Sequence, residues 1–474
     1  MSIFPLFSQK IAQKLPFIAN NSQLKTIDML SEFVLSDRGS DQIFVLRGYA
    51  GTGKTSLIGA LVKAMDEAKM RSFLMAPTGR AAKVFSAMSG KPAFTIHKSI
   101  YRQQKFSVAM EGFQLLDNRQ QNVLFICDEA SMISTLNEGS PFGTGNLLDD
   151  LIEFVYGAEG CRLLLVGDDA QLPPVGQVKS PALDAGHLSG YGLQVVSTQL
   201  TEVARQQLDS GILFNATMLR QHLAEGQVEA LPRVPYKRFK DVRRIDGYEL
   251  LECLENSYNR AGLDDTIIIT RSNARANQFN LAVRNQILGR EEELSAGDRL
   301  LVVRNNYFWG RDLDQLPFIA NGDVVEVRRV RNYRELYGFR FADAEILLPD
   351  YDIDLEVTLL LDTLTVEGPN LPQARQQALF EAIAQDYPEI RNQRDLSRAI
   401  KENPYFNALQ VKYGYCVTCH KSQGGQWSDV YLDVGYINPE HLGIDFYRWI
   451  YTAFTRAVST LYLVNPSDDM LEKC

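Results

Sequence analysis

The sequence lacks a disulfide framework, an apolar run that could cross a membrane, and an excess of basic residues. Its six cysteines are scattered over 474 residues, so a reducing compartment, the cytoplasm, is expected. No apolar run reaches the roughly 20 residues that a bilayer-spanning helix needs. Residues 1–20 mix Phe and Ile with lysines, which argues against a secretory signal peptide. We therefore expect a protein with no membrane partner.

The net charge of −9 argues against a protein that coats nucleic acid, because such proteins are usually basic. It leaves room for a protein that grips a strand in a local groove. Hydrophobic residues make up 45% and charged residues 23%, which is typical of a soluble globular protein. The length allows roughly three domains of about 150 residues each.

Each of three apolar runs in the first half of the sequence is followed by residues that could bind a ligand or take part in catalysis. Continuous apolar runs of this kind favour strands buried on both faces of a parallel sheet. The intervening stretches, such as residues 56–68, have a helical pattern, so we predict a doubly wound α/β domain over residues 1–205. Its ligands should lie at the carboxyl ends of the strands. The runs are residues 43–46, 123–127 and 163–166.

The second half repeats this pattern less densely. Apolar runs at 266–270, 413–418 and 461–464 predict a second α/β domain, formed by residues 206–293 and 411–474. Between these two pieces, short strands at 300–303, 323–327 and 356–361 alternate with turn residues. We therefore predict a mostly β insertion over residues 294–410, with a helix at 371–385. A smaller insertion, a hairpin with strands at 106–110 and 113–116, is predicted at about 101–121.

A complete P-loop follows the first strand and precedes a helix. Its glycines let backbone N–H groups turn toward phosphate oxygens, and the start of the helix adds partial positive charge. Lys54 is expected to reach the β and γ phosphates of ATP, and Thr55 to offer its hydroxyl to Mg²⁺. The alternative, a glycine-rich turn that binds nothing, does not explain the Lys-Thr pair. The predicted nucleotide contacts here are Gly48, Gly51, Thr52, Gly53, Lys54, Thr55 and Ser56.

Two carboxylates follow the strand at 123–127. Asp128 is predicted to hold Mg²⁺, directly or through water, since Mg²⁺ takes one or two carboxylates and keeps several waters. Glu129 is the candidate general base for the attacking water. The pair could instead cap a helix that starts near Ser131. Gln171, after a Gly-Asp-Asp turn, is predicted to contact the γ phosphate and the water.

Two arginines and one glutamine complete the expected nucleotide site. Arg205 and Arg456 are candidate arginine fingers, which stabilise charge on the transferring phosphoryl group. A lone arginine is more often a surface ion pair, and only the motifs around these two favour catalysis. Gln23, in a helical stretch before the P-loop, could read the adenine edge with its amide, or it could be an exposed helix residue.

Taken in order, these segments resemble the motifs of the superfamily 1 helicases. The resemblance is strongest to the Dda and RecD-like branch, of the phage Dda type. It implies two RecA-like P-loop domains with ATP between them, a small hairpin "pin" in the first domain, and an SH3-like β insertion in the second. The matching segments are residues 48–55, 76–83, 95–98, 128–131, 167–174, 200–205, 417–424 and 451–456.

The resemblance implies an ATP- and Mg²⁺-dependent DNA helicase that moves 5′ to 3′ along single-stranded DNA. It implies action at junctions of single- and double-stranded DNA, work as a monomer, and replication, repair or recombination proteins as partners. It assigns strand contacts to Pro77, Thr78, His97, Thr418 and His420, and a nucleotide contact to Gly424. Phe106 and Phe113 in the hairpin could stack on bases, or they could be ordinary strand packing.

Several other interpretations stay open or are rejected. The P-loop chemistry alone does not separate a DNA motor from an RNA motor, because contacts to the 2′-OH cannot be located. A scaffold that has lost turnover would be expected to lack at least one of the catalytic residues. Cys416-Val-Thr-Cys419-His420 matches a haem-attachment pattern, but we predict neither haem nor zinc there. The basic run at 233–244 could bind a backbone or form a solvated face.

Overall fold

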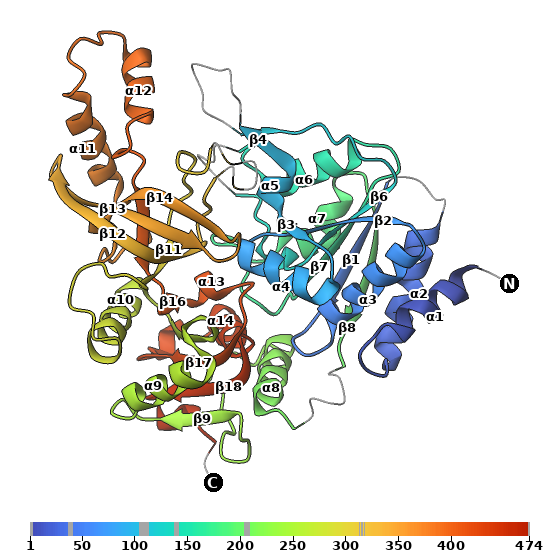
Figure 1. Ribbon diagram of the computed structural model, residues 1–474. Coiled ribbons are helices and arrows are strands. Elements are labelled where there is room, and N and C mark those ends of the chain that lie inside the picture. Colours follow the sequence, from blue (N-terminus) through green and yellow to red (C-terminus); the bar gives the residue numbers. More distant parts are fainter. Residues whose placement is uncertain are drawn as a thin grey trace.

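The computed structural model describes residues 3–36, 41–103, 113–136, 142–202, 209–311, 313, 316 and 318–472. It contains two parallel sheets, each covered by helices on both faces, and a closed β barrel (Figure 1). The fold is therefore α/β, with two RecA-like domains and an SH3-like insertion. None of the helices in the described ranges combines the length and the apolar character needed to cross a membrane.

The first domain is built on a six-stranded sheet of order β3-β2-β6-β7-β1-β8. Alternate residues of β1 face opposite sides: Ile43 packs with α6 and α7, and Phe44 packs with α1, α2 and α3. The strands are β1 (Gln42–Gly48), β2 (Arg71–Ala76), β3 (Ala93–Thr95), β6 (Val123–Cys127), β7 (Arg162–Gly167) and β8 (Gln194–Leu200). The helices are α1 (Ile3–Gln13), α2 (Asn21–Leu35), α3 (Lys54–Glu67), α4 (Gly79–Ser89), α5 (Ile96–Ile100), α6 (Leu147–Tyr156) and α7 (Ala185–Ser189).

The second domain has a five-stranded parallel sheet of order β16-β10-β17-β18-β9. Ile268 of β10 packs toward α9 and α10, while Ile267 and Ile269 pack toward α8 and α14. The strands are β9 (Val242–Ile245), β10 (Thr266–Thr270), β16 (Cys416–Thr418), β17 (Trp427–Asp433) and β18 (Ala457–Val464). The helices are α8 (Gly211–Glu225), α9 (Leu250–Ala261), α10 (Asn273–Ala282), α13 (Cys419–Ser422) and α14 (Ile444–Phe454).

The insertion forms a closed barrel with a helical arm at the top left of Figure 1. The predicted strand at 413–418 is wrong as a single element, because it divides into β15 and β16. Gly414 and Tyr415 separate the two, so the barrel ends at Tyr413 rather than at residue 410. The barrel strands are β11 (Arg299–Val302), β12 (Val324–Leu336), β13 (Phe339–Leu348), β14 (Ile353–Leu360) and β15 (Leu409–Tyr413). The arm consists of α11 (Gln373–Ala384) and α12 (Gln393–Lys401).

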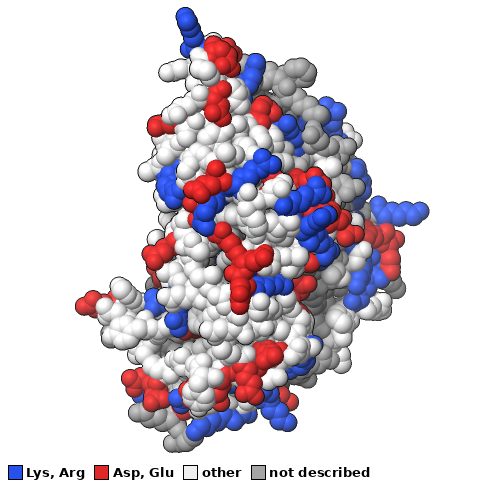
Figure 2. Space-filling model, turned by 60° about the vertical axis from the view of Figure 1, so that its left-hand side comes forward, with Lys and Arg blue, Asp and Glu red and all other residues white. Residues whose placement is uncertain are grey.

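The small hairpin pairs β4 (Tyr101–Gln103) with β5 (Phe113–Leu115), antiparallel, with Tyr101 opposite Leu115. The second predicted strand therefore matches β5. The first, at 106–110, lies outside the described residues, as does Phe106. On the face shown in Figure 2, Lys and Arg are interspersed with Asp and Glu.

Candidate nucleotide and strand-binding sites

The P-loop connects β1 to α3, and its backbone requires glycine at two positions. Gly51 and Gly53 have φ of +73° and +82°, a region that side chains strain to adopt. A Cβ on Gly48 would lie 2.9 Å from Cγ of Lys54. The Lys54 ammonium donates to the carbonyls of Gly48 at 2.6 Å and Tyr49 at 3.0 Å. Both acceptors are backbone atoms of the loop itself, so a phosphate that binds the lysine replaces hydrogen bonds within the loop.

Asp128 and Glu129 follow β6 at the carboxyl edge of the sheet, beside the P-loop. The Thr55 hydroxyl donates to Asp128 Oδ2 at 3.4 Å. Burial and the neighbouring Glu129 raise the pKa of Asp128 to about 6. A hydroxyl and a carboxylate side by side are oxygen ligands of the type that Mg²⁺ takes, so these two residues fit that ion. Glu129 adopts φ of +53°, and the short 3₁₀ helix Ala130–Met132 follows it.

Residues of both domains form one cleft around the P-loop. Lys54, Glu129 and Gln171 line it from the first domain, and Arg456 lines it from the second. The cleft has a volume of about 460 Å³, within the range of roughly 300–1,000 Å³ that is usual for small-ligand sites. We call it the nucleotide cleft. Sequence reasoning did not find Phe17 and Met88, which add apolar surface to its wall.

Gln171 and Arg456 differ in how the protein holds them. The Gln171 side chain is buried, and its Oε1 accepts no hydrogen bond from the described residues. The Arg456 guanidinium donates to the Thr452 and Gly425 carbonyls and to the Thr455 hydroxyl, each at 3.1 Å. Arg456 is therefore fixed at the wall of the cleft. The other candidate finger, Arg205, lies outside the described residues.

Four predicted nucleotide contacts are not part of the cleft lining: Gln23, Gly48, Thr52 and Gly424. The Gln23 amide is buried: it donates to the Thr52 carbonyl at 2.8 Å and accepts from the Asn20 N–H at 2.9 Å. It supports the P-loop from behind, and with 1% of its surface exposed its amide is covered by the protein. Gly424 faces α4 instead, since a Cβ there would lie 3.0 Å from Cβ of Ala81 and 3.1 Å from the Thr78 hydroxyl.

A tyrosine that sequence reasoning missed joins the two domains at the P-loop. The buried hydroxyl of Tyr451, on α14, accepts from the Ala50 N–H at 2.9 Å and donates to Asp168 Oδ2 at 2.7 Å. Asp168 lies 3.9 Å from the Lys54 ammonium. Beside it, the Thr452 hydroxyl accepts from the Leu172 N–H at 2.9 Å. The turn that carries Gln171 is therefore held by the second domain.

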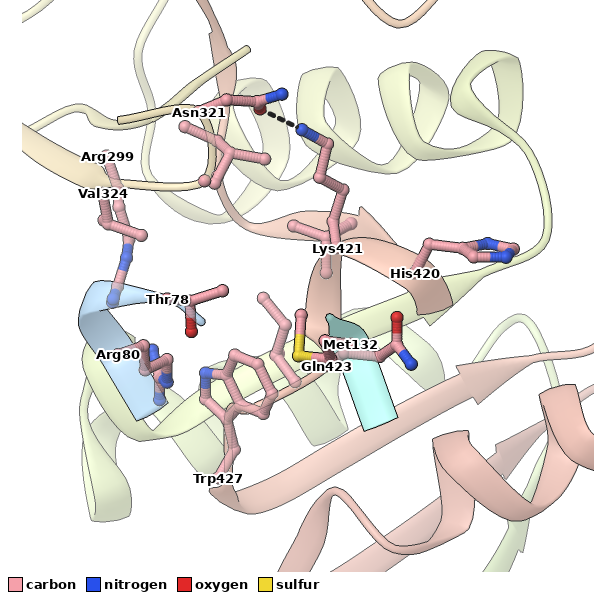
Figure 3. A pocket seen from close by; sticks show the side chains of 15 residues that line it. Thr78, Arg80, Met132, Arg299, Asn321, Val324, His420, Lys421, Gln423 and Trp427 are labelled. Carbon is pink, nitrogen blue, oxygen red and sulfur yellow. Dashed lines mark hydrogen bonds between the residues drawn. The ribbon is translucent and has the colours of Figure 1, made fainter. Parts of the chain in front are cut away.

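A second pocket lies where both domains and the barrel meet, and Figure 3 shows it. Thr78 and His420, two predicted strand contacts, line it from the first and the second domain. Lys421, also in the lining, donates to the side chain of Asn321 in the barrel. Burial lowers the pKa of Lys421 to about 8. We call this the three-domain pocket. Pro77 and Thr418 adjoin it in sequence and are partly exposed.

The remaining predicted strand contacts are packed against aromatic rings. Burial lowers the pKa of His97 to about 4, and its ring lies 4.7 Å from that of Phe142. Phe113 is 6% exposed and packs against Phe142, Tyr307 and Phe318. Strand packing, the alternative left open for Phe113, agrees with this position, because a buried ring cannot stack on a base. Tyr307 and Phe318 belong to the insertion, so the cluster also ties it to the first domain.

The cysteine pair before His420, which matches a haem-attachment pattern, lies in the protein interior. Cys416 and Cys419 are buried, and burial raises the pKa of both thiols. Thiolates, the form that binds metals, are therefore disfavoured. Within the described ranges, no three His, Cys, Asp or Glu side chains gather as potential metal ligands.

Comparison with known proteins shows which families and relatives this chain is similar to. Residues 34–236 match the AAA domain family model, and residues 413–464 match the UvrD-like helicase C-terminal domain. The ATP-dependent DNA helicase dda of Enterobacteria phage T4 is 24% identical over 332 residues, which are 66% of this chain and 68% of that protein. The ATP-dependent RecD2 DNA helicase of Deinococcus radiodurans is 30% identical over 184 residues, which are 38% of this chain and 22% of that protein.

A crystal structure of Pif1 helicase from Bacteroides, in complex with ADP-AlF3 and single-stranded DNA, covers 96% of this chain and 95% of that chain. The identity is 14% and the TM-score is 0.46. The two family models fall on the two α/β domains, the first on residues that include the P-loop and the second on residues that include Arg456. The chain is thus similar, in its matched domains and relatives, to superfamily 1 helicases of the branch that contains Dda and the RecD-like proteins.

Proposed function

We propose that this protein is an ATP-dependent DNA helicase that translocates 5′ to 3′ on single-stranded DNA and unwinds duplex DNA. One observation carries the proposal: the nucleotide cleft and the three-domain pocket are both formed between the same two domains. Lys54 and Arg456 line the first from different domains, and Thr78 and His420 likewise line the second. A change in the angle between the domains alters both sites at once, which is what a motor requires.

The residues of the cleft take distinct roles in this proposal. Lys54 binds the β and γ phosphates, and Thr55 and Asp128 hold Mg²⁺, which neutralises phosphate charge. Glu129 accepts a proton from the attacking water, and Gln171 orients that water. Arg456 stabilises the charge on the transferring phosphoryl group, with Arg205 as the second finger.

The strand is held mainly through its phosphates. The Thr78 hydroxyl and the ammonium of Lys421 are groups that bind phosphate oxygens without reading sequence. A pocket that uses only such groups grips any sequence, as a translocating motor must. We further propose that the protein works as a monomer in the cytoplasm, at junctions of single- and double-stranded DNA, alongside replication or recombination proteins.

The test is ATP hydrolysis with and without single-stranded DNA or RNA, followed by unwinding of duplexes that carry a 5′ or a 3′ tail. The Lys54→Ala variant is the matched control for contaminating ATPases. We expect strong stimulation by DNA and unwinding from the 5′ tail only. Stimulation by RNA alone would replace the DNA motor with an RNA motor. Unwinding from the 3′ tail would overturn the polarity, and no stimulation by either nucleic acid would refute a motor function.

A further inference from the structure

Three consecutive residues, Gly425, Gln426 and Trp427, separate the nucleotide cleft from the three-domain pocket. Gln426 lines the cleft together with Arg456, while Trp427 lines the pocket together with Arg80. The segment follows Gly424, whose φ of +72° turns the chain against the first domain. It is thus the wall that the two sites share.

Two guanidinium groups from different domains hold this wall through adjacent carbonyls. Arg456, on the nucleotide side, donates from Nη1 to the Gly425 carbonyl at 3.1 Å and accepts the Trp427 N–H at its own carbonyl, at 2.9 Å. Arg80, on the opposite side, donates from Nη2 to the Gln426 carbonyl at 2.9 Å. A shift of Arg80 therefore moves the peptide units to which Arg456 is anchored.

Arg80 also stacks on the wall. Its guanidinium carbon lies 4.0 Å from the centre of the Trp427 ring, a cation–π geometry, and Figure 3 shows the two side chains together at the edge of the pocket. Burial lowers the pKa of Arg80 to about 10, although the side chain is only partly buried. The fit leaves no spare room, since a Cβ on Gly425 would lie 2.4 Å from the Trp427 ring.

Arg80 is placed to sense the strand. It lies two residues after Thr78, the N-cap residue of α4, whose hydroxyl accepts the Ala81 N–H at 3.2 Å. A phosphate bound at Thr78 competes for that hydroxyl and acts on the first turn of α4, which carries Arg80. The same turn packs on Gly424, where a Cβ would meet the Thr78 hydroxyl at 3.1 Å.

We propose that Arg80 is a positioning residue that couples strand binding at Thr78 to the placement of Arg456 in the nucleotide cleft, through the wall formed by residues 425–427. This inference rests on the proposed function, because it concerns how single-stranded DNA accelerates ATP hydrolysis. Arg80 acts through the wall and does not touch ATP. Its planar guanidinium is essential, because it stacks on the Trp427 ring and also donates to the Gln426 carbonyl. A lysine ammonium does not reproduce both contacts.

The test compares Arg80→Lys with the wild-type protein in ATP hydrolysis without DNA, and then with oligo(dT) titrated to saturation. Couplings between two sites are typically about 5- to 150-fold, so we expect kcat at saturating DNA to fall by about tenfold. DNA-free turnover should change by less than about twofold, since Arg456 keeps its own bonds to Thr452 and Thr455. The Kd for oligo(dT) should change little, because the positive charge is kept.

Lys83→Gln is the matched control. Lys83 lies on the same helix, one turn further along, and pairs with Asp350 at 3.1 Å at the surface. It should keep full stimulation by DNA. Trp427→Phe is the second variant: it weakens the stacking from the other partner, keeps an aromatic ring in the core, and should reduce stimulation in the same way. Thermal unfolding of each variant verifies that the fold is retained.

Each outcome decides the question. Full stimulation of Arg80→Lys at saturating DNA would overturn the inference. An equal fall of DNA-free and DNA-stimulated turnover would also overturn it, because Arg80 would then support the cleft itself rather than the coupling. A loss confined to the Kd for oligo(dT) would make Arg80 a strand contact. A wild-type protein that DNA does not stimulate would refute the proposed function and this inference together.

Discussion

Replacing Tyr451 by Phe removes one hydroxyl from the contact between the two domains and leaves the ring in the core. The hydroxyl has two partners in the first domain, the Ala50 N–H and Asp168 Oδ2. Ala50 is partly exposed to the cleft, so water can replace the hydroxyl there at little cost. Asp168 is 1% exposed and loses a donor that water cannot readily supply.

The expected magnitude follows from this asymmetry. A hydrogen bond to a charged group contributes about 1.5–3 kcal/mol, and the other bond contributes little because water replaces it. We therefore expect Tyr451→Phe to lower the free energy of unfolding by about 2 kcal/mol. Asp168→Asn removes the negative charge that strengthens the same contact, from the other side. The double variant should therefore cost less than the sum of the two single variants, by about 1–2 kcal/mol.

The assay is urea unfolding of the wild type, the two single variants and the double variant without nucleotide. Tyr447→Phe is the control: it lies on the same helix, and its hydroxyl donates to the Ala230 carbonyl at 2.7 Å within the second domain. It should show no coupling to Asp168→Asn. Independent sites add within about 0.3–0.5 kcal/mol. A coupling energy between Tyr451 and Asp168 inside that limit would refute the claim that the hydroxyl joins the domains.

Three further predictions concern turnover and binding. Lys54→Ala should abolish ATP hydrolysis. Glu129→Gln should keep ATP binding, measured by equilibrium titration, and block turnover. Normal turnover of Glu129→Gln would show that Glu129 is not the general base. Asp128 has a raised pKa of about 6, and Mg²⁺ binds the ionised carboxylate. The affinity for Mg²⁺ should therefore fall as pH drops through about 6. An affinity that does not change with pH would contradict the role of Asp128 as a Mg²⁺ ligand. Lys421 has a pKa lowered to about 8, so its ammonium loses its charge as pH rises through that value. Oligo(dT) binding, measured by fluorescence anisotropy, should therefore weaken above about pH 8. The Lys421→Met variant should not show this pH dependence.

The sequence was sufficient wherever function depends on consecutive residues. A P-loop needs a strand, glycines with positive φ, a lysine and a helix within a dozen positions, and all of these can be read locally. The ends of β1, β6 and β7 were predicted because residues buried on both faces of a sheet form uninterrupted apolar runs. The chemistry assigned to Lys54 and Asp128 remains a prediction, although the structure brings both to one cleft.

Contacts between distant segments could not be predicted. Tyr451 is 401 positions from Ala50 and 283 from Asp168, and no local pattern pairs them. The same reason applies to Gln23, whose amide donates to the Thr52 carbonyl. It also applies to Phe113, because the local sequence pattern of a strand is the same whether its aromatic side chain contacts DNA or packs against other rings. Burial of Phe113 depends on Tyr307 and Phe318, which belong to the insertion.

The two domains are joined on opposite sides of the nucleotide cleft by separate sets of bonds. Tyr451 and Thr452 hold the turn with Gln171 on one side, and Arg80 holds the 425–427 wall on the other. Moving a two-state equilibrium from 1:99 to 99:1 requires about 5.5 kcal/mol, and bonds to charged groups supply about 1.5–3 kcal/mol each. A few such bonds therefore match the energy needed to switch the domains. In the proposed mechanism, ATP phosphates bind at Lys54, beside the first set, and a strand phosphate binds at Thr78, beside the second. This arrangement explains physically why hydrolysis should be fast only when nucleotide and strand are bound together.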